Sequence, residues 1–236
     1  MRYSDAARLP ATAAHVFVED LEALALNDDD AHHLGRVLRL RDGEGVTAAD
    51  GRGGWRPCVF TGAAALRASG PVVQVRPAPP IVVAIALTKG DKPELAVQKL
   101  TELGVDRIVP LEAARCVVRW DEKKTARNLA RLTEVARAAA MQSRRTFLPT
   151  IDAVATVADL VSGVPEIALA HPGGEPLGER ASAIAIGPEG GWSDEELSAA
   201  SRHVDLGTTT LRAETAAVAA GVLLVALRDG RIRAAE

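Results

Sequence analysis

The stretch "IGPEGGWSDEEL", residues 186–197, combines the end of an apolar run, a glycine-rich turn and the start of a helix. Ser193 is the predicted N-cap of that helix, and Glu196 stands three residues later, where it completes a capping box. The segments "EIALA" (166–170) and "AIAIG" (183–187) are short apolar runs typical of strands that are buried on both faces. We therefore expect strand, turn and helix in succession, the usual setting for a ligand at the carboxyl edge of a parallel sheet.

The glycine turn lacks the features of a phosphate-binding loop. Pro188 has no N–H to donate, and Glu189 repels an anion. The dinucleotide and P-loop patterns GxGxxG and GxxxxGK[ST] do not occur in the chain. A ligand with ribose hydroxyls, an adenine edge and positive charge suits the turn better, and S-adenosylmethionine fits that description. The same residues also fit a plain tight turn in which Glu189 caps the following helix.

The rest of the chain predicts an α/β domain preceded by a smaller β-rich domain. Residues 15–76 contain short β-rich pieces separated by Asp-Gly turns, which favours a small barrel or sandwich. The proline-rich stretch 76–80 is a candidate boundary, and beyond it apolar strands alternate with helical segments. We predict domains at 1–75 and 81–236, the second with a mainly parallel sheet.

Helix boundaries in the second domain follow from capping residues. One helix is expected to begin with Asp91 as its N-cap and to end at Gly104, and a long one runs from Asp121 to about Ser143. A last short strand, "VDLG", and a final helix that ends at Gly230 complete the pattern. Three segments then follow apolar strands and form the candidate ligand site: "AHPGGEPLG" (170–178), "GPEGG" (187–191) and "GTTTLRAET" (207–215).

Composition is that of an ordinary globular protein, with 47% hydrophobic and 25% charged residues. No apolar run approaches the roughly 18 residues of a membrane span, and the N-terminus lacks the pattern of a signal peptide. Cys58 and Cys116 form neither a disulfide framework nor a metal-ligand cluster. We expect a cytoplasmic protein with reduced thiols, no membrane contact and no metal.

Charge is distributed unevenly, although the formal net charge is only -3. The net charge is -5 over residues 1–35, +9 over 36–147 and -7 over 148–236. The most basic part, 115–145, holds nine Lys and Arg residues against three acidic ones. This asymmetry predicts a surface that binds a polyanion. The alternative is a helix face that is simply exposed to solvent, which would show the same charge pattern.

The glycine turn, followed by "LGTTTLRAETAAVAAGVLL" (206–224), resembles the signature of ribosomal RNA small subunit methyltransferase E. This is a family of SPOUT-class enzymes that methylate N3 of a uridine in 16S ribosomal RNA. Further similar segments occur in the same order: "HHLGRVLRLRDGEGV" (32–46), "LTKGDKPELAVQKLTELGVDRIVPL" (87–111), "RCVVRW" (115–120) and "EVARAAAMQSRRTFLPTI" (134–151). The segment "LGTTTLRAET" departs from the family, which more often has a glycine-basic-aliphatic run before the leucine.

The resemblance implies an α/β fold of SPOUT type with a C-terminal trefoil knot that forms the S-adenosylmethionine site. It also implies a PUA-like RNA-binding β-barrel at the N-terminus, a homodimer with the cofactor site close to the partner subunit, and the assembled small ribosomal (30S) subunit as substrate. A non-catalytic RNA-binding or ribosome assembly factor, and a SPOUT enzyme that acts on another RNA, are the alternatives.

By the same resemblance, the cofactor is held by backbone and side chains at Leu169, His171, Gly187, Glu189, Gly190, Gly191, Leu206, Gly207, Leu211, Arg212, Glu214 and Thr215. Uracil N3 must lose a proton, and negative charge then grows on the ring oxygens. We expect Arg212 to stabilise the negative charge on the ring oxygens, and Glu214 or Glu189 to accept the N3 proton. The alternatives are a structural Arg212–Glu214 ion pair and catalysis by orientation of the reactants.

Six arginines are candidates for RNA phosphates, because the planar guanidinium binds phosphate oxygens in pairs. They are Arg36, Arg39 and Arg41 in the small domain and Arg115, Arg144 and Arg145 in the large one. Aromatic residues make up only 3% of the chain, so we expect recognition through the shape and charge of a folded RNA.

Overall fold

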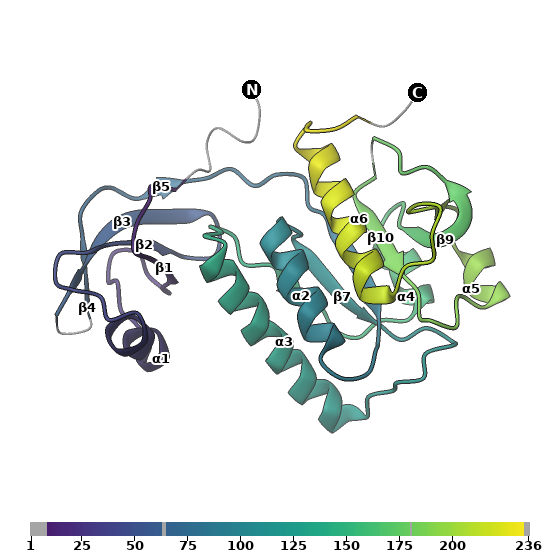
Figure 1. Cartoon of the computed structure of the whole chain (residues 1–236), viewed down its shortest axis with the longest axis horizontal. Coiled ribbons are helices and arrows are strands. Elements are labelled where there is room, and N and C mark those ends of the chain that lie inside the picture. Colours follow the sequence, from purple (N-terminus) through teal and green to yellow (C-terminus); the bar gives the residue numbers. More distant parts are fainter. Residues whose placement is uncertain (1–8, 63–64, 180, 234–236) are drawn as a thin grey trace. The chain divides into compact units, whose positions relative to one another are not determined.

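The computed structural model describes residues 9–62, 65–179 and 181–233, and the chain divides into two compact units. The first unit takes residues 1–78 together with 140–148, and the second takes 79–139 and 149–236 (Figure 1). The chain therefore leaves the second unit, contributes a segment to the first, and returns. The predicted division at 1–75 and 81–236 does not include this return.

The first unit is built on a five-stranded sheet with the order β1-β2-β3-β4, in which β5 also pairs with β3. The β1–β2 pair is parallel and the other pairs are antiparallel. Its elements are β1 (Ala14–Phe17), α1 (Asp28–His32), the π-helical segment η2 (His33–Val37), β2 (Gly45–Ala49), β3 (Gly54–Thr61), β4 (Ala65–Ala68) and β5 (Val73–Gln74).

The segment 140–148 completes the first unit. The His15 ring bonds through Nε2 to the Arg145 carbonyl at 2.9 Å and through Nδ1 to the Thr47 hydroxyl at 2.8 Å. Gly53 has a φ of 99°, and a Cβ built there would lie 2.4 Å from Cζ of Phe147. Only glycine fits this position, because both the backbone conformation and the aromatic ring exclude a side chain.

The second unit is a six-stranded sheet with the order β11-β9-β10-β6-β7-β8, in which every pair of strands is parallel. This confirms the predicted α/β class. The elements are β6 (Val82–Ala86), α2 (Lys92–Leu103), β7 (Arg107–Leu111), α3 (Glu122–Gln142), β8 (Thr150–Ile151), α4 (Val157–Gly163), β9 (Ala168–Glu175), β10 (Ala183–Ile186), α5 (Asp194–Ala199), β11 (His203–Val204) and α6 (Ala213–Arg228).

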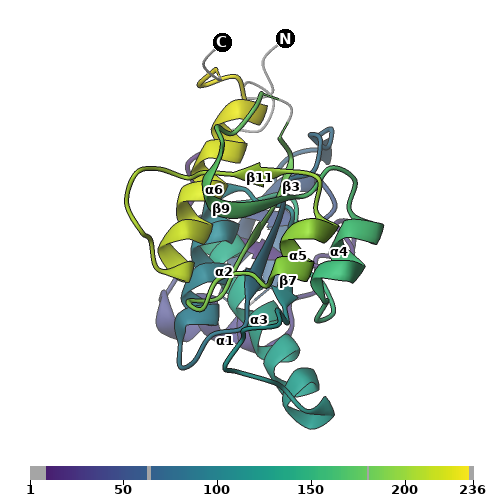
Figure 2. The ribbon, with the colours of Figure 1, turned by 90° about the vertical axis from the view of Figure 1, so that its right-hand side faces the viewer.

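Helices cover both faces of this sheet, which explains why its strands are continuously apolar (Figure 2). Val83 and Ile85 of β6 belong to a core cluster with α2, α3 and α6. Val82 and Ala84 belong to a second cluster that includes residues of α4 and a tryptophan before α5. Successive side chains of one strand thus enter opposite cores.

Two capping predictions are confirmed in full and a third only in its position. Gly104 adopts a φ of 100° after α2, and Ser193 and Glu196 form a complete capping box at α5. Asp91 occupies the N-cap position of α2, but its side chain accepts no capping hydrogen bond. Its ψ of 0° is not the extended conformation that directs a cap toward the first amides, and Pro93 removes one of those amides.

The prediction of a loop over 170–178 is also wrong in part, since β9 continues to Glu175. In the pairing with β11, His203 lies opposite Leu169 and Val204 lies opposite Glu175, so residues 170–174 bulge out between two paired positions. Gly174 permits this close pairing, because a Cβ there would lie 2.7 Å from the backbone of His203. The predicted strand "VDLG" is reduced to His203–Val204.

Candidate functional site

Three segments meet at one edge of the sheet: the bulge 170–174 within β9, the turn 187–191 after β10 and the stretch 206–215 between β11 and α6. The indole N–H of Trp192 donates to the Ala170 carbonyl at 2.8 Å. The Asp205 carboxylate accepts hydrogen bonds from the amides of Gly173, at 2.8 Å, and Gly207, at 2.9 Å. These bonds hold the pKa of Asp205 below its ordinary value and tie the bulge to the last segment. The expected clustering of the three segments is confirmed.

Trp192 forms the floor of the glycine turn. Only 4% of its surface is exposed, and it packs within the core on the α4 side. A Cβ added to Gly187 would lie 2.9 Å from Cε2 of this ring. The turn therefore approaches the indole as closely as glycine allows, and Trp192 packs directly under it.

The charge of Glu189 is balanced by a residue that the sequence does not single out. Lys92, the first residue of α2, lies with its Nζ 3.0 Å from Oε1 of Glu189 and 3.8 Å from Oε2 of Glu214. The hydrogen bond from Lys92, followed by its charge, lowers the pKa of Glu189 below the ordinary value. A carboxyl with a lowered pKa is a weaker proton acceptor, so Glu189 is the poorer candidate for a base.

Glu214 is the more suitable carboxylate. Its side chain is 16% exposed, and Oε2 is buried without a hydrogen-bond partner. Arg212 occupies the N-cap position of α6 and is exposed, and among the described residues it forms no salt bridge. The structural Arg212–Glu214 ion pair considered above is therefore not found.

The remaining candidate residues surround the same edge of the sheet. Leu169 is fully buried, and the His171 ring lies 6.0 Å from the ring of His203 in an edge-on contact. Leu206 and Leu211 are partly buried against the core that includes α6. Gly190, Gly207 and Thr215 are exposed, and Gly191 is half-buried with a φ of 70°.

Arg115 lies at the glycine turn, where its guanidinium donates to the Gly190 carbonyl at 3.2 Å. The neighbouring amide of Ala114 donates to Oε1 of Glu196 at 2.7 Å. The segment before α3 is thus fastened both to the glycine turn and to α5. Contact of Arg115 with RNA stays a prediction.

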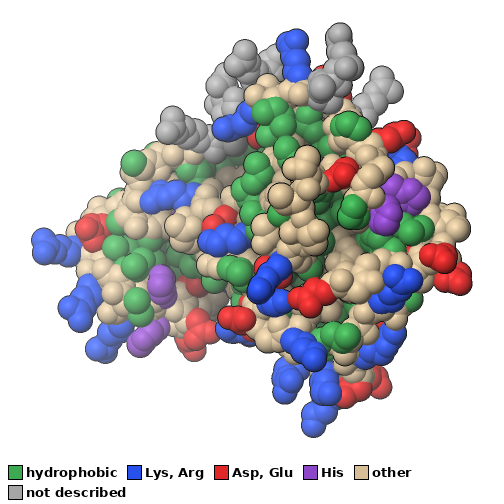
Figure 3. All heavy atoms as spheres, turned by 45° about the vertical axis from the view of Figure 1, so that its right-hand side comes forward, with side chains coloured by type: hydrophobic (Ala, Val, Ile, Leu, Met, Phe, Trp, Pro, Cys, Tyr) green, Lys and Arg blue, Asp and Glu red, His purple; other side chains and the backbone are tan. Residues whose placement is uncertain are grey.

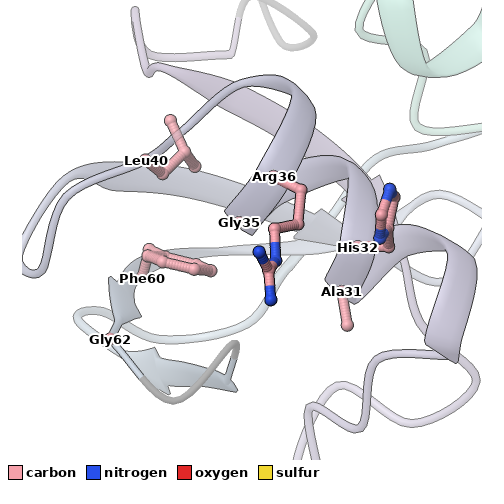
Figure 4. Close-up of a pocket in the computed structure, with 7 residues that line it drawn as sticks. All are labelled: Ala31, His32, Gly35, Arg36, Leu40, Phe60 and Gly62. Atoms are coloured by element: carbon pink, nitrogen blue, oxygen red, sulfur yellow. The ribbon is translucent and has the colours of Figure 1, made fainter.

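The arginines of the first unit have different environments. Arg36 is exposed and lines a hollow of about 320 Å³, with Phe60 and Gly62 on its other side (Figure 4). Arg39 and Arg41 follow in an exposed stretch. These three side chains stay candidates for RNA.

Arg144 fits its predicted role in RNA binding less well, and RNA contact by the Arg145 side chain stays a prediction. The Arg144 guanidinium donates to the Thr12 hydroxyl at 2.7 Å and also to the carbonyls of Thr12 and Pro10. The Arg145 carbonyl bonds to His15. Both residues hold the segment 140–148 in the first unit, a role that sequence alone did not indicate because their partners lie more than a hundred residues away.

Comparison with known protein families agrees with this geometry. A family model described as an RNA methyltransferase domain matches residues 76–225, and one described as an RNA methyltransferase PUA domain matches residues 26–66. The fold and the site thus define an RNA methyltransferase domain with a PUA domain before it.

Individual relatives narrow this class. The ribosomal RNA small subunit methyltransferase E of Mycobacterium bovis is 36% identical over 228 residues, which cover 85% of this chain and 86% of the relative. The chain belongs to the ribosomal RNA small subunit methyltransferase E family. The enzyme of that name from Neisseria gonorrhoeae, solved bound to S-adenosyl methionine, superposes with a TM-score of 0.75 at 26% identity, covering 89% of this chain and 96% of that one. A Legionella pneumophila protein in complex with the same cofactor gives 0.77 at 27% identity, with coverages of 90% and 96%.

Three further properties concern the described residues alone. No helix there is both long and apolar enough to cross a membrane. No group of His, Cys, Asp or Glu side chains could hold a metal ion. Cys58 and Cys116 are buried free thiols, and burial raises the pKa of each.

Proposed function

We propose that this protein transfers the methyl group of S-adenosylmethionine to N3 of a uridine in 16S ribosomal RNA, in the cytoplasm and on the assembled small subunit. Membership of the family supports small-subunit ribosomal RNA as the substrate. The solved relatives from Neisseria and Legionella support the cofactor. The observation that carries the proposal is a pair of carboxylates that share Lys92: Glu189 of the glycine turn accepts its hydrogen bond, and Glu214 of α6 has a buried oxygen that lacks a hydrogen bond.

The residues of the site fit this cofactor. Oε2 of Glu214, which lacks a hydrogen bond, and the exposed carboxylate of Glu189 can accept hydrogen bonds from hydroxyl or ammonium groups. Leu206 and Leu211 offer apolar surface to an adenine ring. When bound, S-adenosylmethionine supplies an electrophilic methyl group. The two carboxylates share a single lysine, which leaves acceptor capacity for the ligand's ammonium or hydroxyl groups.

The chain's own residues then act on the uracil. Glu214 receives the N3 proton, since it is half-buried and lacks the hydrogen bond that makes Glu189 a weaker base. Arg212, exposed beside it in sequence and free of a salt bridge in the described part of the chain, places positive charge near the ring oxygens. This charge matters most after the proton has left, when the ring is anionic.

A C-terminal trefoil knot and a homodimer belong to the same proposal. The chain leaves β11, at one edge of the sheet, and α6 then packs against α2, β6 and β10 in its centre. That return of the last helix to the middle of the sheet supports the knot. Light scattering in solution tests the dimer.

The proposal predicts a specific chemical product. Small subunits from a deletion strain are expected to lack 3-methyluridine and to regain it when incubated with this protein and S-adenosylmethionine. Nucleoside mass spectrometry of ribosomal and transfer RNA provides the measurement. An unchanged 3-methyluridine content in small-subunit RNA would reject the proposal, and loss from transfer RNA instead would favour another target.

Cofactor binding distinguishes the enzyme from an RNA-binding assembly factor without activity. Titration calorimetry is expected to show S-adenosylmethionine binding at sub-millimolar concentration. No heat of binding at that concentration would favour the assembly factor.

Gly187→Ala is expected to weaken cofactor binding about tenfold and to lower the free energy of unfolding by about 1–3 kcal/mol, because the new methyl group meets the buried Trp192 ring. Calorimetry and denaturant unfolding measure the two effects. Gly163→Ala is the matched control, since a Cβ at that position meets nothing within 4 Å. Equal behaviour of the two variants would show that the turn tolerates displacement of the indole.

A further inference from the structure

A second hollow, of about 310 Å³, lies in the second unit beyond the carboxyl end of β6. Its walls are the segment between β6 and α2, residues 118–120 and one side of the first half of α3. β6 is the sheet neighbour of β10, with Ile85 opposite Ile186, so the hollow and the glycine turn follow adjacent strands. The residues that line the hollow are not among those assigned to the cofactor.

One buried polar group in this hollow lacks a hydrogen-bond partner. Thr88 Oγ1 is buried and has no hydrogen bond. Asn128 and Trp120 also line the hollow, and within the described part of the chain their side chains make no hydrogen bond, so the Asn128 amide and the Trp120 indole N–H are open to water or to a ligand. Buried polar groups in proteins are usually satisfied, so the unpaired Thr88 hydroxyl, in a hollow that other polar side chains also line, indicates a polar ligand.

The charge of the lining selects the class of ligand. Lys89 is exposed at the hollow and, among the described residues, has no salt bridge. Lys124 of α3 adds a second cation that is shared with the exposed Asp121 at 3.5 Å, and the facing Glu94 is neutralised by Arg131 at 3.1 Å. Basic side chains gather over the start of α3 at the lower end of the face in Figure 3. A hollow lined mainly by hydrogen-bond donors and cations suits an anion with oxygen acceptors and disfavours the cationic cofactor.

We propose that this hollow binds a phosphorylated nucleotide of the RNA substrate, a neighbour of the uridine that is methylated. Lys89 and Lys124 contact the phosphate, while Thr88, Asn128 and Trp120 contact the ribose and base. The identity of the RNA in this inference rests on the proposed function. The location of the site rests only on the residues that line the hollow.

Thr88→Val tests the unpaired hydroxyl. The variant keeps the shape of the side chain and removes a buried group that has no partner, so its free energy of unfolding is expected to equal or exceed that of the wild type. Its affinity for radiolabelled 16S ribosomal RNA, measured by filter binding, is expected to fall about fivefold. Unchanged RNA affinity would remove Thr88 from the site.

Lys89→Gln is compared with Lys123→Gln, a matched change at an exposed lysine of α3 outside the hollow. Lys89→Gln is expected to weaken RNA retention about tenfold and to reduce the salt dependence of binding by roughly one counterion. Lys123→Gln is expected to bind like the wild type. Equal retention by the two variants overturns the inference, and so does a loss of S-adenosylmethionine affinity confined to Lys89→Gln.

The same set of measurements separates this inference from the proposed function. Calorimetry with S-adenosylmethionine and methylation of small subunits test the proposed function with wild-type protein. Filter binding requires neither cofactor nor turnover. The difference in RNA retention between the Lys89 and Lys123 variants therefore shows whether RNA binds in the hollow, even if no methylation is observed.

Discussion

Replacement of Arg212 by alanine is expected to lower the kcat of methyl transfer about 100-fold, while the Kd for S-adenosylmethionine changes by less than about threefold. The guanidinium is exposed at the N-cap position of α6 and makes no salt bridge in the described chain, so its removal leaves no buried charge behind. Its contribution therefore arises when the uracil ring becomes anionic. Single-turnover kinetics with small subunits, together with calorimetry, measure the two quantities.

Two further variants define what the Arg212 result means. Arg212→Lys keeps the charge and is expected to recover part of the rate, whereas Arg231→Ala, an exposed arginine just beyond α6, is expected to behave like the wild type. An equal loss of kcat and of cofactor affinity in Arg212→Ala would mark a binding residue. Full activity of Arg212→Ala would show that another group stabilises the anionic uracil ring.

Acidification from pH 7.5 to pH 5 is expected to destabilise the first unit by about 2 kcal/mol through His15 alone. Burial, with a smaller effect of the nearby Arg144 charge, lowers the pKa of His15 from 6.5 to about 4, although the bond to the Arg145 carbonyl opposes the shift. The folded unit thus holds the neutral ring, and the unfolded chain takes up the proton first as the pH falls. The stabilisation is complete above about pH 6.5 and is lost as the pH falls toward 4.

Hydrogen exchange of the β1 and β2 amides measures this effect within the first unit. His15→Gln is the control, because an amide N–H can still donate to the Arg145 carbonyl but does not titrate in this range. The difference between wild type and variant isolates His15 from the carboxylates that titrate over the same interval. Identical pH profiles for the two proteins would contradict the assignment.

Features set by neighbours in sequence were predictable. The capping box at Ser193, the C-terminal Gly104 and the long α3 all depend on residues within a few positions of one another. The expected carboxyl-edge cluster of three segments also follows, because parallel strands that alternate with helices place their following loops at one edge.

Features set by distant partners were not predictable. The bulge in β9 requires β11, about thirty residues later, and Lys92 reaches Glu189 across 97 positions. Arg144 looked like a surface cation in a basic run, yet its guanidinium binds Thr12, 132 residues away. Thr88 gave no signal at all, since an isolated threonine after a strand is common and only the fold shows that its hydroxyl is buried without a partner.

The return of residues 140–148 to the first unit has a consequence for synthesis on the ribosome. The N-terminal sheet cannot bury Phe17 and Ala49 against Ala140, or satisfy the His15 ring, until residue 148 has left the exit tunnel. By then β6, α2 and β7 of the second unit have already emerged. Domains usually fold in order from the N-terminus during translation. In this chain the first unit can complete its folding only after part of the second unit has been synthesised, so the two units are expected to fold together. Neither 1–78 nor 79–236 is therefore expected to fold as an isolated fragment.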